Sequence, residues 1–215
     1  MVSVLLSNPL LLGLALGVKH AFEPDHLAAI STMVTRSTSV RAAASTGAAW
    51  GVGHGGSIVV FGGVLIAMGV RVPPSVAMVL DLAVAVVLVA LGIQALLRVR
   101  RRDRELDRDV HPHEHRRAAK RSTLVGFVHG ASGTAAITIV CLTTFPSSTQ
   151  AVGFLVLFSL GALVSMSALS GLLARPLSAL VRRGKTGARA LDVASGVLAL
   201  VAAIAVTIAA FHTTA

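Results

Sequence analysis

The sequence predicts an all-α integral membrane protein, on three observations. Of its 215 residues, 54% are hydrophobic and only 13% are charged, against about 25% charged in an ordinary soluble domain. The mean hydropathy is +0.81. The apolar residues form long runs rather than alternating with polar ones, as in bilayer helices. We therefore expect six transmembrane helices, over about 4–30, 45–69, 75–97, 122–143, 150–174 and 189–211.

The basic charge follows the topology of these six spans. The net charge is +10, and the loops on one side hold every Lys and Arg except Lys19 and Arg71. Cytoplasmic loops carry such an excess of cations. This side is predicted to be cytoplasmic, with both termini outside the cell membrane. The distribution favours the lipid bilayer over nucleic acid as the partner. The single cysteine, Cys141, excludes an internal disulfide.

One long polar segment, 99–121, divides the chain into two halves of three spans each. We expect it to be a charged cytoplasmic loop between a first three-helix repeat at 1–98 and a second at 122–215. Its histidine cluster, from His111 to His115, is interpreted as part of a solvated loop. The alternative is a loop that gathers or senses metal.

The two halves resemble each other at nearly constant spacing. Three pairs match in order, at separations of 109, 108 and 111 residues: 17–20 with 126–129, Gly53 with Gly161, and Asp81 with Asp192. A repeat of three spans must be inverted in the membrane, because an odd number of crossings reverses the second copy. Inverted repeats are typical of secondary transporters, with the substrate site near the midplane. Asp81 and Asp192 are expected to cap helix ends or to carry protons.

Ionisable side chains interrupt the first span, in the stretch KHAFEPDH at 19–26. Such groups inside an apolar span are costly and mark a functional site by default. On a straight helix His20 and His26 would point away from each other. Pro24 has no N–H and clashes with the carbonyl of His20, so we expect the helix to be kinked or unwound over about 20–24. This break would bring His20, Asp25 and His26 together and free the His20 carbonyl.

Two imidazoles and a carboxylate suit Zn, Cu, Ni, Co or Fe(II), rather than Mg or Ca, which take oxygen ligands. His54 and His129 are further candidates, because each lies beside glycine within an apolar span, where a neighbouring helix can approach closely. For either residue alone, a hydrogen-bonded structural histidine is the alternative. Glu23 is expected to neutralise Lys19 or to accept a proton. The candidate metal ligands are His20, Asp25, His26, His54 and His129.

These residues resemble the motifs of the nickel/cobalt transporter family, and of its short members related to hydrogenase- and urease-associated nickel permeases. The spacing His20-x4-Asp25-His26 is similar to the family's H-x4-D-H element. The stretch GHGGS at 53–57 resembles its glycine-histidine motif, and 126–130 its G-x-x-H-G element. The resemblance covers most of the chain, without the extra acidic motifs of longer members. It implies that the transported Ni(II) or Co(II) binds to His20, Asp25, His26 and His54.

We therefore expect a secondary permease for Ni(II) or Co(II), with uptake as the direction, no bound cofactor and no enzymatic activity. The sequence contains no glycine loop of the ATP-binding type, so the driving force is predicted to be the membrane potential or a proton gradient. Efflux is the alternative direction. Two other classes stay open: a membrane-embedded metalloenzyme, and an accessory protein that donates metal to a maturation complex.

Overall fold

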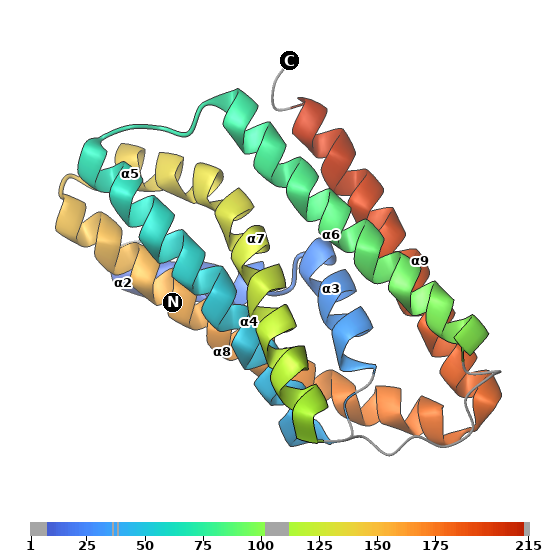
Figure 1. The fold of residues 1–215 in the computed structure, drawn as a ribbon. Helices are drawn as coiled ribbons and strands as arrows, with labels where there is room; N and C mark the ends of the chain where they lie inside the picture. Colours follow the sequence, from blue (N-terminus) through green and yellow to red (C-terminus); the bar gives the residue numbers. More distant parts are fainter. Residues whose placement is uncertain (1–7, 36, 38, 102–111, 213–215) are drawn as a thin grey trace.

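The computed structural model describes residues 8–35, 37, 39–101 and 112–212, and these residues form helices and their connections without a β-strand (Figure 1). In chain order the helices are α2 (Pro9–His20), α3 (Pro24–Val34), α4 (Val40–Ser57), the π-helical turn η1 (Ile58–Gly62), α5 (Gly63–Met68), α6 (Pro74–Arg101), α7 (Pro112–Thr144), α8 (Ser148–Arg182) and α9 (Lys185–His212). The expected all-helical class is therefore confirmed for the described residues.

Five helical segments are long and apolar enough to cross a membrane: Val40–Met68, Pro74–Arg100, Ala118–Thr144, Ser148–Arg182 and Lys185–His212. The first of them joins α4, η1 and α5. In order they correspond to the second to sixth predicted spans. The predicted first span, 4–30, is not one membrane-length helix, because its described part is divided into α2 and α3. The described residues thus contain five candidate spans where six were predicted.

The break between α2 and α3 lies where Pro24 predicted it. A proline disfavours helical backbone at the residue before it, and Glu23 is extended, with φ −62° and ψ 146°. Pro24 is the first residue of α3. A backbone N–H at this position has no acceptor within the helix, so the missing N–H of proline costs no hydrogen bond. The expectation of a freed His20 carbonyl is wrong, because the Glu23 N–H donates a hydrogen bond to it at 3.0 Å.

Helix extends into both ends of the segment 99–121, which was predicted to be a loop. α6 continues to Arg101, and α7 begins at Pro112. Proline is favoured at the first helical position, and the Ala, Lys and Arg residues around it are good helix formers despite their charge. Of the predicted histidine cluster, His111 lies outside the described residues, and 112–115 forms the start of α7.

The polarity of the molecule is that expected of a protein in a bilayer. Large apolar side chains lie on the outside, and Val86 and Leu172 are each about 70% exposed (68% and 70%). Polar side chains lie inside, and His54 and Thr138 have no exposed surface. In water this arrangement would leave a large apolar surface uncovered. It suits a chain whose outer face meets lipid and whose interior holds a polar site.

The helices pack as two groups. α4 lies at the centre of one group, with α2, α7 and α8, and α3 lies between this group and the pair of α6 and α9. α4 packs between α7 and α8, and α2 packs along α8. α6 packs along α9 at the opposite edge of the bundle, and α3 lies between this pair and the rest (Figure 1). The break at Pro24 therefore separates a segment held by α8 from a segment held by α9 and α6.

Glycines bring several of these helices to backbone contact. A Cβ atom on Gly17 would overlap the carbonyl of Phe158, and one on Gly126 would overlap the carbonyl of Trp50. Gly126 follows Gly17 by 109 residues, and Phe158 follows Trp50 by 108. The same close contact therefore occurs once between α2 and α8 and once between α7 and α4, at the spacing of the two halves.

Gly126→Ala is expected to lower the free energy of unfolding by about 1–3 kcal/mol, because the added methyl group overpacks the contact with Trp50. Gly56→Ala is the matched control, since a Cβ atom there meets nothing within 4 Å. Thermal unfolding of the purified full chain in detergent measures both variants. Equal midpoints would contradict the close approach of α7 to α4.

Candidate metal centre

Three imidazoles converge where the chain breaks between α2 and α3. His20 ends α2, His26 lies in the first turn of α3, and His54 lies in α4. The ring centroids of His20 and His26 are 4.4 Å apart, and those of His26 and His54 are 5.1 Å apart. Each ring offers one nitrogen within 4.8 Å of the others. Three of the five candidate ligands thus form one cluster, which we call the imidazole cluster.

The spacing of the nitrogens fits a shared metal ion. His20 Nε2 and His54 Nε2 are 3.1 Å apart. With metal–imidazole bonds of about 2.0–2.1 Å, two adjacent ligands of one ion stand roughly 2.9–3.4 Å apart. Nitrogens at this distance can share either one proton or one metal ion. His26 Nε2 is buried without a hydrogen-bond partner, so it can supply a third nitrogen.

Carboxylates fix the orientation of two of these rings. Asp25 Oδ1 lies 3.1 Å from His26 Nδ1, and Glu23 Oε2 lies 2.9 Å from His20 Nδ1. A carboxylate on one ring nitrogen favours the tautomer that leaves the other nitrogen free to bind a metal, and it makes that nitrogen more basic. Glu23 was expected to neutralise Lys19 or to accept a proton. Its contact with His20 was not named, although their spacing of three residues could have indicated it.

His129 takes a different place from the one expected of a ligand. Its Nε2 lies 3.6 Å from Asp25 Oδ2, and its ring centroid is 5.4 Å from that of His26. It is not part of the imidazole cluster, and it faces the carboxylate that orients His26. The structure therefore places His129 beside Asp25 rather than among the three clustered imidazoles. Asp25 contacts both His26 and His129, and its carboxylate forms a second group of possible ligands with Glu23 and His26.

Aromatic side chains that the sequence reasoning did not select form the wall of the cluster. Trp50 is fully buried, with its ring 5.2 Å from that of His26 and 5.6 Å from that of His129. The ring centroid of Phe158 lies 5.2 Å from that of His20. These rings keep water from one side of the imidazoles and limit their rotation. Trp50 is the only tryptophan in the chain, which could have drawn attention to it.

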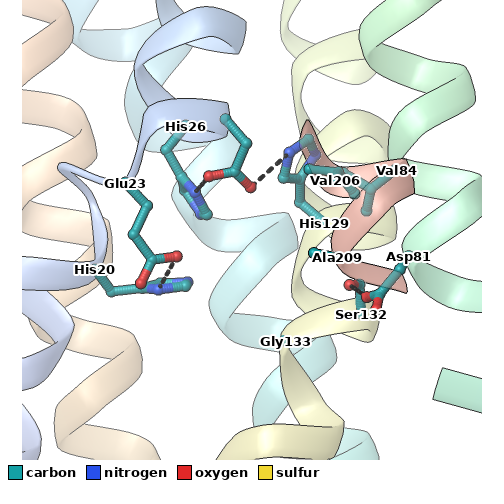
Figure 2. A pocket seen from close by; sticks show the side chains of 11 residues that line it. His20, Glu23, His26, Asp81, Val84, His129, Ser132, Gly133, Val206 and Ala209 are labelled. Carbon is teal, nitrogen blue, oxygen red and sulfur yellow. Dashed lines mark hydrogen bonds and ion pairs between the residues drawn. The ribbon is translucent and has the colours of Figure 1, made fainter. Parts of the chain in front are cut away.

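A pocket of about 280 Å³ adjoins the cluster on its other side. Figure 2 shows His20 and Glu23 at one side of the pocket, and Asp81 and Ser132 at the opposite side. Asp81 was expected to cap a helix or to carry protons. Capping is excluded, because Asp81 lies about two turns beyond the start of α6. Ser132 of α7 donates a hydrogen bond to its carboxylate.

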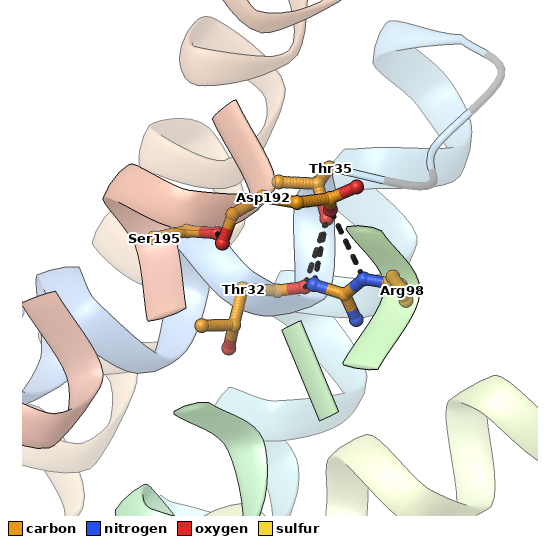
Figure 3. Close-up of polar contacts among 5 residues, drawn as sticks. All are labelled: Thr32, Thr35, Arg98, Asp192 and Ser195. Atoms are coloured by element: carbon orange, nitrogen blue, oxygen red, sulfur yellow. Dashed lines mark hydrogen bonds and ion pairs between the residues drawn. The ribbon is translucent and has the colours of Figure 1, made fainter. Parts of the chain in front are cut away.

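Arg98 joins three helices near the other end of α3 (Figure 3). Its Nε donates to Asp192 Oδ1 of α9 at 3.1 Å. Its Nη2 lies 3.4 Å from the Thr32 carbonyl and 3.5 Å from Thr35 Oγ1, where the helix dipole favours a cation. Asp192 is buried about two turns into α9. It therefore forms an ion pair rather than the expected helix cap.

A curated relative shares most of the chain. The chain is 28% identical over 181 residues to the urease accessory protein UreH of Bacillus sp. (strain TB-90). The match covers 81% of this chain and 79% of that protein, so the similarity extends over most of the chain rather than one motif. No protein-family profile and no solved structure matches the chain.

Proposed function

We propose that this chain is a membrane permease for a divalent transition metal, with Ni(II) or Co(II) as the substrate and uptake as the direction. The observation that carries the proposal is the buried imidazole cluster at a break in a helix. Imidazole ligands suit Ni, Co, Cu and Zn. Broken helices inside a membrane are typical of ion sites in secondary transporters, where they line a cavity or are buried in protein.

The metal is cargo in this proposal, so its site must release it. The imidazole cluster offers three nitrogens, which leaves further coordination positions of the ion to water. An ion that keeps part of its water binds less tightly than one in a closed shell of protein ligands. Asp25 and Glu23 act through His26 and His20, by holding the ring nitrogens in the tautomer that binds metal.

The two ends of the bundle support alternating exposure of the site. Asp81 and Asp192 occupy matching positions in the two halves, 111 residues apart. Asp81 lines the open pocket, whereas Asp192 is held by Arg98 next to α3. This asymmetry is expected of one state of an alternating-access cycle, in which the path to the site is open at the Asp81 end and closed at the Asp192 end. The recurrence of the glycine contacts in both halves supports the inverted repeat on which this cycle depends.

The similar protein favours one second candidate. It is named a urease accessory protein, and the short transporters that the motifs resemble include relatives associated with urease. An accessory protein that binds metal at the membrane and donates it to a maturation complex would use the same cluster. The two candidates differ in whether metal crosses the membrane.

Flux into proteoliposomes separates the two candidates. The purified full chain is reconstituted, a membrane potential or a pH gradient is imposed, and Ni(II) and Co(II) inside the vesicles are measured. We expect saturable uptake by the wild type and none above background for His20→Ala or Asp25→Ala. A wild-type chain that binds Ni(II) but moves none under either gradient would overturn the permease and favour the accessory protein.

A further inference from the structure

Three carboxylates line the pocket beside the imidazole cluster, those of Glu23, Asp25 and Asp81. Glu23 lies in the break between α2 and α3, Asp25 in the first turn of α3, and Asp81 in α6. No Lys or Arg is among the described residues that line the pocket. An acidic pocket inside a bundle of apolar helices concentrates cations, because its low-dielectric walls focus the field.

Asp81 has no structural role that accounts for its charge. Asp81 lies within α6 and accepts a hydrogen bond from Ser132, which a neutral side chain could equally accept. The Glu23 side chain contacts His20 Nδ1 but makes no capping hydrogen bond. It is half exposed, so its carboxylate can also reach an ion in the pocket. Charged groups at membrane depth are costly and are retained for a partner or a function.

The ring of His129 is a sign of a ligand in this pocket that is independent of the imidazole cluster. His129 lines the pocket, and its side chain is 1% exposed. Neither of its ring nitrogens has a hydrogen-bond partner, and Nε2 lies 3.6 Å from Asp25 Oδ2. A buried polar atom left in this way is destabilising. Water molecules carried by a bound cation would satisfy such an atom.

We propose that the pocket holds a second, outer site for a hydrated divalent cation, which the ion occupies before it reaches the imidazole cluster. This proposal rests on the proposed permease function. Glu23, Asp25 and His26 offer ligand atoms within 4.8 Å of one another. Asp81, on the opposite wall, binds the same ion through its water.

His26 connects the two sites, because it belongs to both groups of ligands. At the outer site the ion has mainly carboxylate and water ligands. It then exchanges these for the nitrogens of His20 and His54 while His26 stays bound. The ion therefore loses its water in steps. The outer site is less selective than the inner one, because carboxylate and water also suit Mg and Mn, whereas imidazoles favour Ni, Co, Cu and Zn.

Mn(II) is the probe for the outer site, because it takes carboxylate and water ligands and its EPR signal reports the bound fraction. His54→Ala removes the inner cluster, and we expect this purified variant still to bind Mn(II). Adding Asp81→Asn and Glu23→Gln should weaken Mn(II) binding by about 10-fold or more. Adding only Asp81→Glu to His54→Ala keeps the charge, and the affinity for Mn(II) should stay near that of His54→Ala. Failure of His54→Ala to bind Mn(II), or binding that ignores the two carboxylates, overturns the outer site.

Transport kinetics test the place of the outer site on the path of the ion. In proteoliposomes Asp81→Asn is expected to raise the KM for Ni(II) by about 10-fold with little change in the maximal rate, because it weakens capture of the ion. Asp81→Glu should keep the wild-type KM. An unchanged KM in Asp81→Asn overturns the assignment to the path. A wild-type chain that moves no Ni(II) overturns the permease instead, and the Mn(II) measurement still decides the outer site.

Discussion

His54→Ala is expected to weaken Ni(II) binding by about 100-fold or more, and to abolish transport. His54 Nε2 lies 3.1 Å from His20 Nε2, and no other described side chain takes that position in the imidazole cluster. Changes to the partners of metal ligands cost about 10- to 100-fold in affinity, and loss of a ligand costs at least the upper part of that range. Titration calorimetry of the purified chain with Ni(II) measures the effect.

Two further histidines give this measurement its controls. His212→Ala should keep the wild-type affinity, because His212 is exposed at the end of α9 and bonds only the Ile208 carbonyl in the structure. His129→Ala should have an intermediate effect of about 10-fold, because His129 contacts Asp25 rather than the cluster. Wild-type affinity in a folded His54→Ala variant would remove this residue from the site. A loss in His129→Ala as large as that in His54→Ala would instead make His129 a direct ligand.

Arg98→Met is expected to lower the free energy of unfolding by up to about 3–5 kcal/mol, because it removes the Arg98 guanidinium from the buried carboxylate of Asp192. Asp192 is 1% exposed, and Arg98 is 13% exposed. The double variant Arg98→Met/Asp192→Leu should recover most of the loss, because a buried ion pair replaced by apolar groups is often neutral for stability. Thermal unfolding in detergent compares the wild type, the single variant and the double variant.

The control for this cycle is Arg121→Met. Arg121 bonds Gln94 between α7 and α6 at an exposed position, and exposed polar pairs contribute little to stability. We expect its midpoint to stay near that of the wild type. If the single variant Arg98→Met unfolds like Arg121→Met, the ion pair with Asp192 does not hold α3, α6 and α9 together. A double variant less stable than Arg98→Met would contradict loss of the ion pair at the Asp192 carboxylate as the cause.

The sequence predicted the central feature of the site because that feature is local. Pro24 lacks an N–H and forces the residue before it out of the helical region, so the break between α2 and α3 needs no information from other helices. His20, Asp25 and His26 are all within a few residues of this break, and their proximity follows from it. The extent of the break was less predictable, since one hydrogen bond from Glu23 decides that the His20 carbonyl stays occupied.

The sequence also predicted the class of the protein, since the length and polarity of an apolar run are properties of the run itself. The number of membrane-length helices was less predictable. The first run contains the predicted break and forms the short helices α2 and α3, so five long apolar helices are found where six spans were expected. Helix boundaries in the charged segment were also missed, because Arg, Lys and Ala favour helix whether or not the helix lies in a membrane.

The sequence named His54 as a candidate ligand, but only the tertiary structure decided which distant side chains lie together and where. His54 is 34 residues from His20, and its place opposite that ring depends on how α4 packs between α7 and α8. The same holds for Asp81 across the pocket and for Arg98 beside Asp192. Side chains on different helices meet according to the rotation and the register of those helices, which close contacts such as those of Gly17 and Gly126 set. By itself the sequence determined the break and the chemistry at it, and helix packing determined which partners complete the site.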